Sequence, residues 1–240
     1  MSDKIPVMEV FGPTIQGEGM VIGQKTMFVR TAGCDYQCVW CDSAFTWDGS
    51  ERDKTRWMTP KEVLDELFKL GQGRFHHVTI SGGNPALIGE PMKHFIELCH
   101  EANLQVGLET QGSKVQDWFF QIDDLTLSPK PPSSGMKPDL KALDELVDAL
   151  LEEKVHFSLK VVVFDAADLD FARCLFARYD GVPKYLQVGN DRPRDPGDVS
   201  GHLLTRLKWL FEQVIADPGL NDVRVLPQLH ALVWSNERAK

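Results

Sequence analysis

The chain has 240 residues, of which 42% are hydrophobic and 25% are charged, and its formal net charge is -9. This composition excludes a disordered chain and is typical of a globular protein with one substantial core. The acidic charge, without a basic stripe, argues against nucleic acid as a partner and favours a small-molecule substrate.

Neither a membrane span nor a secretory signal is expected. No apolar run approaches the roughly 18 residues that a spanning helix needs. The segment Met1–Phe11 has no basic region followed by an apolar stretch, as a signal peptide would have. We therefore expect a cytoplasmic protein whose thiols are reduced.

Strand-like and helix-like segments alternate along the chain, and no repeat or long linker divides it. The expected strands are Lys25–Arg30, His77–Ser81, Gln105–Glu109, Asp124–Leu127, Phe157–Phe164, Tyr185–Val188 and Asp222–Leu226. The expected helices are Thr59–Leu70, Pro91–Ala102, Leu140–Leu151, Ala166–Tyr179 and Leu203–Ile215. This alternation predicts a single α/β domain over residues 1–240, folded as a partial TIM-type (β/α) barrel of about six parallel strands.

The first of these helices has the clearest boundary signals. Thr59 can cap it, Pro60 suits its first position, and Glu62 completes a capping box. Gly71 is the residue expected to end it.

Polar or glycine-rich motifs directly follow five of the expected strands. They are Cys34, Gly82-Gly83-Asn84-Pro85, Thr110-Gln111-Gly112, Ser128-Pro129-Lys130 and Gly189-Asn190-Asp191. Ligands of parallel α/β folds bind at the carboxyl ends of the strands. We therefore expect the five motifs to converge on one face.

Three of the five cysteines lie close together, with the spacing Cys34-x3-Cys38-x2-Cys41. In a reducing compartment this spacing indicates a metal or cluster site and not disulfides. A [4Fe–4S] cluster that only transfers electrons usually has four cysteines, so three leave one iron open for another ligand. Structural zinc is the alternative, but it needs a fourth ligand, and the nearest histidines, His76 and His77, are distant in sequence.

The other two cysteines, Cys99 and Cys174, fall on apolar helix faces beside Phe95 and Phe171. Free cysteines in such positions behave as small hydrophobic side chains. We expect both to be inert core thiols.

The cysteine motif, with Trp40 just before its last cysteine, resembles the signature of the radical S-adenosylmethionine superfamily. The resemblance implies that the open iron chelates the amino and carboxylate groups of S-adenosylmethionine. One electron then cleaves this cofactor to a 5′-deoxyadenosyl radical. Trp40 would flank the cofactor, a role compatible with packing in the core. The segment Ser81–Pro85 resembles the superfamily's GGEP segment, which holds the methionine amino group. Here Asn84 replaces the glutamate and keeps a side-chain oxygen that can accept a hydrogen bond.

A longer resemblance begins at Phe11-Gly12-Pro13-Thr14-Ile15-Gln16-Gly17-Glu18-Gly19, which is similar to the start of 7-carboxy-7-deazaguanine synthases. It continues through Trp40-Cys41-Asp42-Ser43, Glu109-Thr110-Gln111-Gly112, Ser128-Pro129-Lys130, Leu186-Gln187-Val188-Gly189-Asn190 and Gln228-Leu229-His230. The family converts 6-carboxy-5,6,7,8-tetrahydropterin to 7-carboxy-7-deazaguanine and ammonia, in the queuosine and deazapurine pathway. The resemblance also implies regenerated S-adenosylmethionine, Mg²⁺, a homodimer and a flavodoxin or ferredoxin as electron donor.

Family matching implies a role for each residue of the expected site. Substrate binding is implied for Ile15, Gln16, Gly17, Arg30 and Ser81. Mg²⁺ binding is implied for Ser43. Cofactor binding falls to Trp40, Asp42, Gly83, Glu109, Ser128, Lys130, Gln187 and Asn190. The chemistry of three side chains leaves alternatives. Arg30 suits a bidentate pair with the substrate carboxylate or a surface ion pair. Ser43 offers Mg²⁺ a hard oxygen or caps a turn. Glu109 binds the cofactor ribose or serves the structure.

One contact of some relatives does not transfer to this chain. In those relatives the terminal carboxylate helps to read the substrate, whereas here ten residues follow His230. Gln228, His230 and Asp191 remain candidates for reading the amino-pyrimidine edge. Lys160 has only its strand position in its favour and is assigned no role.

Two other functions fit the cysteine motif. A glycyl-radical activase has a similar short domain, but the Thr14–Gly19 segment argues against it. A non-enzymatic iron–sulfur electron-transfer protein is opposed by the missing fourth cysteine and by the GGNP loop.

Overall fold

The computed structural model describes residues 3–240, so Met1 and Ser2 of the expected domain lie outside the described residues. The fold is built on one mixed sheet. Its strands are β1 (Ile5–Ile15), β2 (Lys25–Thr31), β3 (Arg56–Met58), β4 (His77–Gly82), β5 (Gln105–Thr110), β6 (Asp124–Leu127), β7 (Phe157–Val163), β8 (Lys184–Val188) and β9 (Val223–Leu226). Their order is β3-β1-β2-β4-β5-β6-β7-β8-β9. Strands β2 and β4 to β9 are parallel, and β1 is antiparallel to both β2 and β3. The expected partial barrel is confirmed, with seven parallel strands rather than about six.

Strands β1 and β3 were not predicted from the sequence. Gly12 and Pro13 are unfavourable inside a strand, but a register shift between Phe11 and Thr14 accommodates them while pairing with β2 continues. Strand β3 has three residues, two of them exposed, so it carries no alternating pattern.

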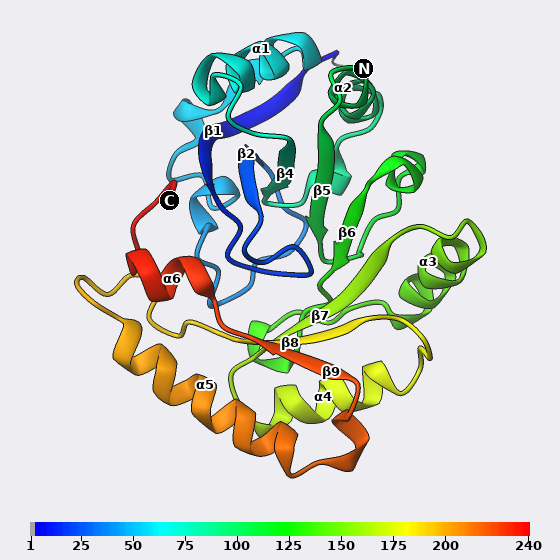
Figure 1. Cartoon of the computed structure of the whole chain (residues 1–240), viewed down its shortest axis with the longest axis vertical. Coiled ribbons are helices and arrows are strands. Elements are labelled where there is room, and N and C mark those ends of the chain that lie inside the picture. Colours follow the sequence, from blue (N-terminus) through cyan, green and yellow to red (C-terminus); the bar gives the residue numbers. More distant parts are fainter. Residues whose placement is uncertain (1–2) are drawn as a thin grey trace.

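Helices cover the outside of the curved sheet (Figure 1). They are α1 (Pro60–Gly71), α2 (Glu90–Glu101), α3 (Leu140–Glu152), α4 (Ala166–Phe176) and α5 (Ser200–Ile215), whereas the short α6 (Leu229–Trp234) lies at the cavity, which His230 and Ala231 line. Five match the predicted helices, and the short α6 was missed. The capping box of α1 is present, with Thr59 and Glu62 each bonded to the other's backbone N–H. The residue that ends α1 in a left-handed conformation is Gln72 and not Gly71, which is the helix's last residue.

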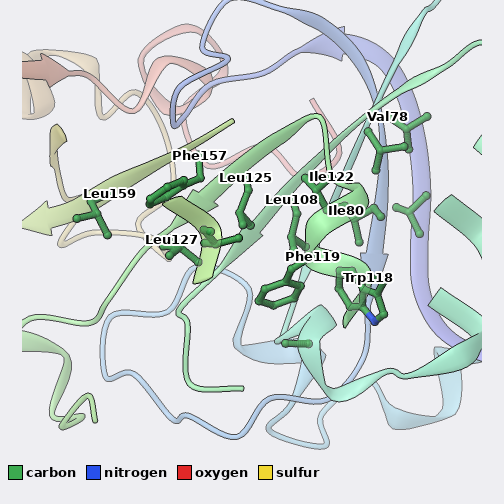
Figure 2. Close-up of a cluster of buried hydrophobic side chains, with 14 of the residues drawn as sticks. Val78, Ile80, Leu108, Trp118, Phe119, Ile122, Leu125, Leu127, Phe157 and Leu159 are labelled. Atoms are coloured by element: carbon green, nitrogen blue, oxygen red, sulfur yellow. The ribbon is translucent and has the colours of Figure 1, made fainter. Parts of the chain in front are cut away.

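Side chains of the parallel strands alternate between the helix-facing side and the barrel interior. Helix-facing residues form the hydrophobic core, in which Val78, Ile80, Leu108, Leu125 and Leu127 lie near Trp118 and Phe119 (Figure 2). Trp118 is fully buried, and its indole N–H donates to the carbonyl of Ile88 at 3.0 Å. The interior-facing positions carry polar residues such as Glu109 and Lys160, which are therefore available to a site inside the barrel.

The C-terminal part of the chain leads from β9, at one edge of the open sheet, to β1 near the other edge. The N–H of Leu229, at the start of α6, donates to the carbonyl of Gly17 at 3.0 Å, just after β1. Arg238 is ion-paired with Glu9 on β1. Figure 1 shows α6 and the C-terminus beside β1. None of the helices within residues 3–240 is long and apolar enough to cross a membrane.

Candidate active site

A cavity of about 420 Å³ lies at the carboxyl ends of the parallel strands. Residues that follow β2, β4, β5, β6 and β8 line it, which confirms the predicted convergence of the polar motifs. Every residue that the sequence assigned to the site lines this cavity: Ile15, Gln16, Gly17, Arg30, Cys34, Cys38, Trp40, Cys41, Asp42, Ser43, Ser81, Gly83, Glu109, Ser128, Lys130, Gln187 and Asn190. Their common location is established, whereas their individual roles stay predictions.

The three clustered cysteines lie on the loop after β2, and all are free thiols. The backbone N–H of Tyr36 donates to Cys34 Sγ at 3.4 Å, and the indole N–H of Trp47 donates to Cys41 Sγ at 3.4 Å. Burial raises the pKa of the Cys38 thiol to about 11, so iron must displace a proton when it binds there. Hydrogen bonds to sulfur stabilise cluster ligands. The donor set therefore fits a [4Fe–4S] cluster with one open iron.

The two histidines nearest to the cysteines in sequence do not support the structural-zinc alternative. His77 lies at the first residue of β4, at the opposite end of the strand from the cysteine loop. Its ring is buried and bonded through Nδ1 to the hydroxyl of Thr26 at 2.8 Å. His76 immediately precedes it. Neither histidine can therefore complete a zinc site with the three cysteines.

The two remaining cysteines have different environments. Cys99 is fully buried on α2, and burial raises the pKa of its thiol to about 12, so the predicted inert core thiol is confirmed. The prediction for Cys174 was wrong, because this side chain is exposed. The buried face of α4 consists of Asp168, Leu169, Ala172, Leu175 and Phe176, and Cys174 lies outside it.

Gly83 allows the end of β4 to approach the cysteine loop closely. A Cβ at this position would lie 2.0 Å from the carbonyl oxygen of Gly33 and 3.1 Å from Cys34 Cβ. The N–H of Asn84 donates to that same carbonyl at 2.7 Å. Gly83 and the backbone of Asn84 thus allow the cysteine loop to pack closely against the end of β4.

The side chain of Asn84 connects protein segments and does not line the cavity. Its Oδ1 accepts from the hydroxyl of Thr110 at 2.9 Å and from the N–H of Ala86 at 3.2 Å. Its Nδ2 donates to Asp35 Oδ1 at 2.8 Å and to the hydroxyl of Ser113 at 3.1 Å. The oxygen accepts hydrogen bonds, as its chemistry predicts, but both of its acceptor positions are used within the protein.

Lys160 lies between two carboxylates on the floor of the cavity. Its side chain is 2% exposed, and Nζ lies 2.7 Å from Glu18 Oε2 and 2.9 Å from Glu109 Oε2. Burial alone would lower the pKa of Lys160, but the two carboxylates hold it above its usual range. Burial would likewise raise the pKa of Glu18, and Lys160 and His230 instead hold it well below its usual range. Lys160 and Glu18 were not assigned from sequence. The signal was a single lysine within the apolar strand β7, on its inward face.

Arg30 already has an ionic partner within the chain. Its guanidinium lies 3.2 Å from Glu9 Oε2, its cross-strand neighbour on β1, and over the rings of Phe11 and Phe45 at 5.3 and 5.5 Å. Arg238 pairs with the same carboxylate and stacks on Phe45 at 3.6 Å. Arg30 nevertheless lines the cavity, so the ion pair and a substrate contact are compatible.

The turn-cap alternative for Ser43 was wrong. Ser43 precedes the short 3-10 helix Ala44–Thr46, but its side chain makes no cap hydrogen bond. The only contact recorded for its hydroxyl among residues 3–240 is with Cys41 Sγ, at 3.8 Å. The hydroxyl is therefore available to a ligand in the cavity.

The three candidates for binding the amino-pyrimidine edge of the substrate differ in whether they line the cavity. Asp191 is paired with His202 at 2.6 Å and Arg206 at 3.2 Å and does not line the cavity. Gln228 and His230 do line it. Gln228 Nε2 donates to Glu18 Oε1 at 2.9 Å and to Asp42 Oδ2 at 3.1 Å.

Comparisons with known proteins agree with this geometry. A model of the radical SAM superfamily matches residues 28–165. The chain therefore belongs to the radical SAM superfamily, whose fold and three-cysteine loop it contains. It is 57% identical to the 7-carboxy-7-deazaguanine synthase of Bacillus subtilis, over 99% of both chains, and 54% identical to that of Bacillus cereus, over 98% of both. Within the superfamily, the chain belongs to the family of 7-carboxy-7-deazaguanine synthases.

Solved structures show the same fold. The crystal structure of QueE from Escherichia coli has a TM-score of 0.70 with 22% identity and covers 95% of both chains. A structure of native anSMEcpe with bound AdoMet has a TM-score of 0.55 with 21% identity and covers 81% of this chain and 61% of that one. The family of curated relatives favours a synthase over both an activase and an electron-transfer protein.

Proposed function

We propose that the protein converts 6-carboxy-5,6,7,8-tetrahydropterin to 7-carboxy-7-deazaguanine with release of one ammonia, in queuosine or 7-deazapurine biosynthesis. The observation that carries this proposal is the 57% identity to the Bacillus subtilis synthase over 99% of both chains. The conversion loses one nitrogen and three hydrogens as ammonia and requires no net oxidation. S-adenosylmethionine can therefore be regenerated in each cycle.

Cys34, Cys38 and Cys41 would hold the [4Fe–4S] cluster, which supplies one-electron cleavage of S-adenosylmethionine. The cofactor is proposed to lie along one wall of the cavity, in contact with Trp40, Asp42, Gly83, Glu109, Ser128, Lys130, Gln187 and Asn190. These residues come from the cysteine loop and from the carboxyl ends of β4, β5, β6 and β8. The indole of Trp40 is fixed for this role, since its N–H donates to the hydroxyl of Ser133 at 3.0 Å and its ring contacts Phe164 at 4.8 Å.

The substrate is proposed to bind between Ile15–Gly17, Arg30 and Ser81. Arg30 would pair with the substrate carboxylate, since a guanidinium offers two parallel donors. Glu9 competes for the same guanidinium, and Arg238 can keep Glu9 paired when the substrate takes its place. Exchange between carboxylates avoids leaving a buried charge without a partner, which supports this arrangement.

Mg²⁺ is proposed to bind the hydroxyl of Ser43, with substrate oxygens and water completing its coordination. Mg²⁺ commonly takes few protein ligands and keeps several waters. The absence of a cap hydrogen bond on this hydroxyl supports the proposal.

The remaining proposals concern the surroundings of the enzyme. We propose a homodimer that receives electrons from a flavodoxin or ferredoxin. A reducing, cytoplasmic compartment is also proposed, because all five cysteines are free and a cluster requires reduced ligands.

The test is anaerobic reconstitution with iron and sulfide, followed by product analysis with the carboxylated tetrahydropterin. Formation of 7-carboxy-7-deazaguanine and ammonia in equal amounts is expected, with S-adenosylmethionine not consumed in proportion. The Cys38→Ala variant, treated identically, is the control for product formed without the cluster. Cofactor cleavage without any conversion of the pterin would overturn the proposed substrate.

A further inference from the structure

Gln111 is a cavity residue to which no role has yet been assigned. It follows β5 directly, and its side chain is 6% exposed and lines the cavity. Its Nε2 donates to Asp35 Oδ1 at 2.8 Å and lies 3.7 Å from Cys34 Sγ. The amide therefore lies directly beside the cysteine loop.

The orientation of the Gln111 amide follows from its neighbours. The carboxylate of Asp35 accepts hydrogen bonds and donates none, so the nitrogen of the amide must face it. A flipped amide would place two oxygens against each other. Asp35 is held by two further donors, Asn84 Nδ2 at 2.8 Å and the hydroxyl of Ser113 at 2.7 Å. The position of the carboxylate, and with it the orientation of the amide, is thus fixed from three sides.

The oxygen of the Gln111 amide remains open to the cavity. Among residues 3–240 no donor to Gln111 Oε1 is found within hydrogen-bond distance. Seven buried side-chain atoms lack a hydrogen-bond partner in that part of the chain, and they include Oε1 of Gln187 and of Gln228 but not of Gln111. An unpartnered oxygen that is not enclosed must be accessible, and this side chain lines the cavity. Gln111 therefore presents an acceptor there, close to the cluster ligands.

We propose that Gln111 Oε1 accepts a hydrogen bond from the methionine amino group of S-adenosylmethionine, and that Asp35 orients the amide for this contact. An amino group bound at the open iron of a cluster held by Cys34, Cys38 and Cys41 would have N–H donors that need an acceptor. Asn84 cannot supply it, because its oxygen is bonded to Thr110 and Ala86. Gln111, which follows β5, offers a side-chain acceptor beside the cysteine loop. The sequence pattern had placed this acceptor in the segment after β4. This inference rests on the proposed radical S-adenosylmethionine chemistry.

A different role for the same amide would give a different result in measurements of affinity and reduction potential. If Gln111 acts only as an N–H donor to Cys34 Sγ, its removal changes the reduction potential of the cluster. The affinity for S-adenosylmethionine would then stay the same. Binding and potential must therefore both be measured on the same variants.

The main experiment compares wild type with Gln111→Leu after anaerobic reconstitution to equal iron content. Dissociation constants are measured for S-adenosylmethionine and for 5′-methylthioadenosine, which lacks the amino acid part of the cofactor. Loss of one hydrogen bond near a charged centre is expected to weaken S-adenosylmethionine binding about tenfold or more. Binding of 5′-methylthioadenosine should change by less than about twofold. The control is Gln105→Leu, an exposed glutamine at the opposite end of β5, away from the cysteine loop.

Equal affinity of wild type and Gln111→Leu for S-adenosylmethionine would overturn the proposal, as would an equal loss for both ligands. If Gln111→Leu does not assemble a cluster, Asp35→Ala provides the test, because it leaves the glutamine in place. Without the carboxylate the amide can rotate, so S-adenosylmethionine affinity should fall by about two- to tenfold. Unchanged affinity in Asp35→Ala contradicts the orienting role. These binding measurements need no pterin, so their failure is distinct from a failure to convert the proposed substrate.

Discussion

The ammonium group of Lys160 on β7 lies 2.7 Å from the carboxylate of Glu18, which belongs to the loop after β1. The same ammonium lies 2.9 Å from Glu109 on β5. One buried lysine therefore ties the segment proposed to bind substrate to a residue proposed to bind cofactor. The depressed pKa of Glu18 and the raised pKa of Lys160 keep these two groups charged at every pH between their ordinary values of 4.5 and 10.5.

The first prediction concerns Lys160 and its two carboxylate partners. Lys160→Met should destabilise the fold by about 3–5 kcal/mol near neutral pH, because two half-buried carboxylates lose their buried cation. Their repulsion and burial then raise the folded-state pKa of one carboxyl above its unfolded value. The resulting penalty is present above the raised pKa and disappears as pH falls through it. The difference in melting temperature from wild type should therefore be smaller at about pH 5 than at about pH 8.

The control for this prediction is Lys141→Met, at a position that is 88% exposed and forms only a surface pair with Glu145. Its effect should stay within about 0.5 kcal/mol at both pH values. A difference between Lys160→Met and wild type that does not vary with pH would show that the cost comes from packing alone.

The second prediction concerns the cysteines. Cys34→Ala, Cys38→Ala and Cys41→Ala should each lose the cluster and the visible absorbance of the reconstituted protein, because each thiolate anchors a separate iron. Cys99→Ala and Cys174→Ser serve as controls with full iron content. The fully buried Cys99 should show a modest loss of stability, and the exposed Cys174 should show a change within about 0.5 kcal/mol. Normal iron content in Cys38→Ala would contradict the cluster assignment.

The third prediction concerns Arg30. Arg30→Ala should raise KM for the pterin much more than it lowers uncoupled cleavage of S-adenosylmethionine, because the guanidinium is proposed to bind the substrate carboxylate. Arg30→Lys should recover only part of the loss, since an ammonium cannot form the paired contact. Arg56→Ala, which breaks an exposed pair with Glu66, is the matched control. An equal loss of both activities in Arg30→Ala would indicate that Arg30 supports the cysteine loop.

The sequence was sufficient for features encoded by local spacing. The cysteine loop, the capping box at Thr59 and Glu62, and the position of polar motifs after the strands follow from rules that act over a few residues. The parallel strands were found for the same reason, since their apolar runs are short and bounded.

Features that depend on partners far apart in the chain were not accessible from the sequence. Glu18 and Lys160 are 142 positions apart, and only closure of the barrel brings them together. The partner of the Asn84 oxygen could not be predicted, because nothing local shows that Thr110 donates to it. Cys174 was misplaced because the apolar residues around it occupy the neighbouring face of α4. In each case the missing information is a tertiary contact.

The last prediction concerns Mg²⁺ and Ser43. Ser43 lies two residues after the last cysteine ligand, and its hydroxyl makes no cap hydrogen bond. A cation bound there can orient the substrate and stabilise negative charge that develops during the rearrangement. Turnover is measured against Mg²⁺ concentration for wild type, Ser43→Thr and Ser43→Ala. Threonine keeps the oxygen and should preserve the response, whereas alanine should raise the Mg²⁺ requirement by roughly tenfold or more. Ser50→Ala, on an exposed turn with Asp48, is the control. An alanine variant at position 43 with the wild-type Mg²⁺ response would remove this residue from the metal site.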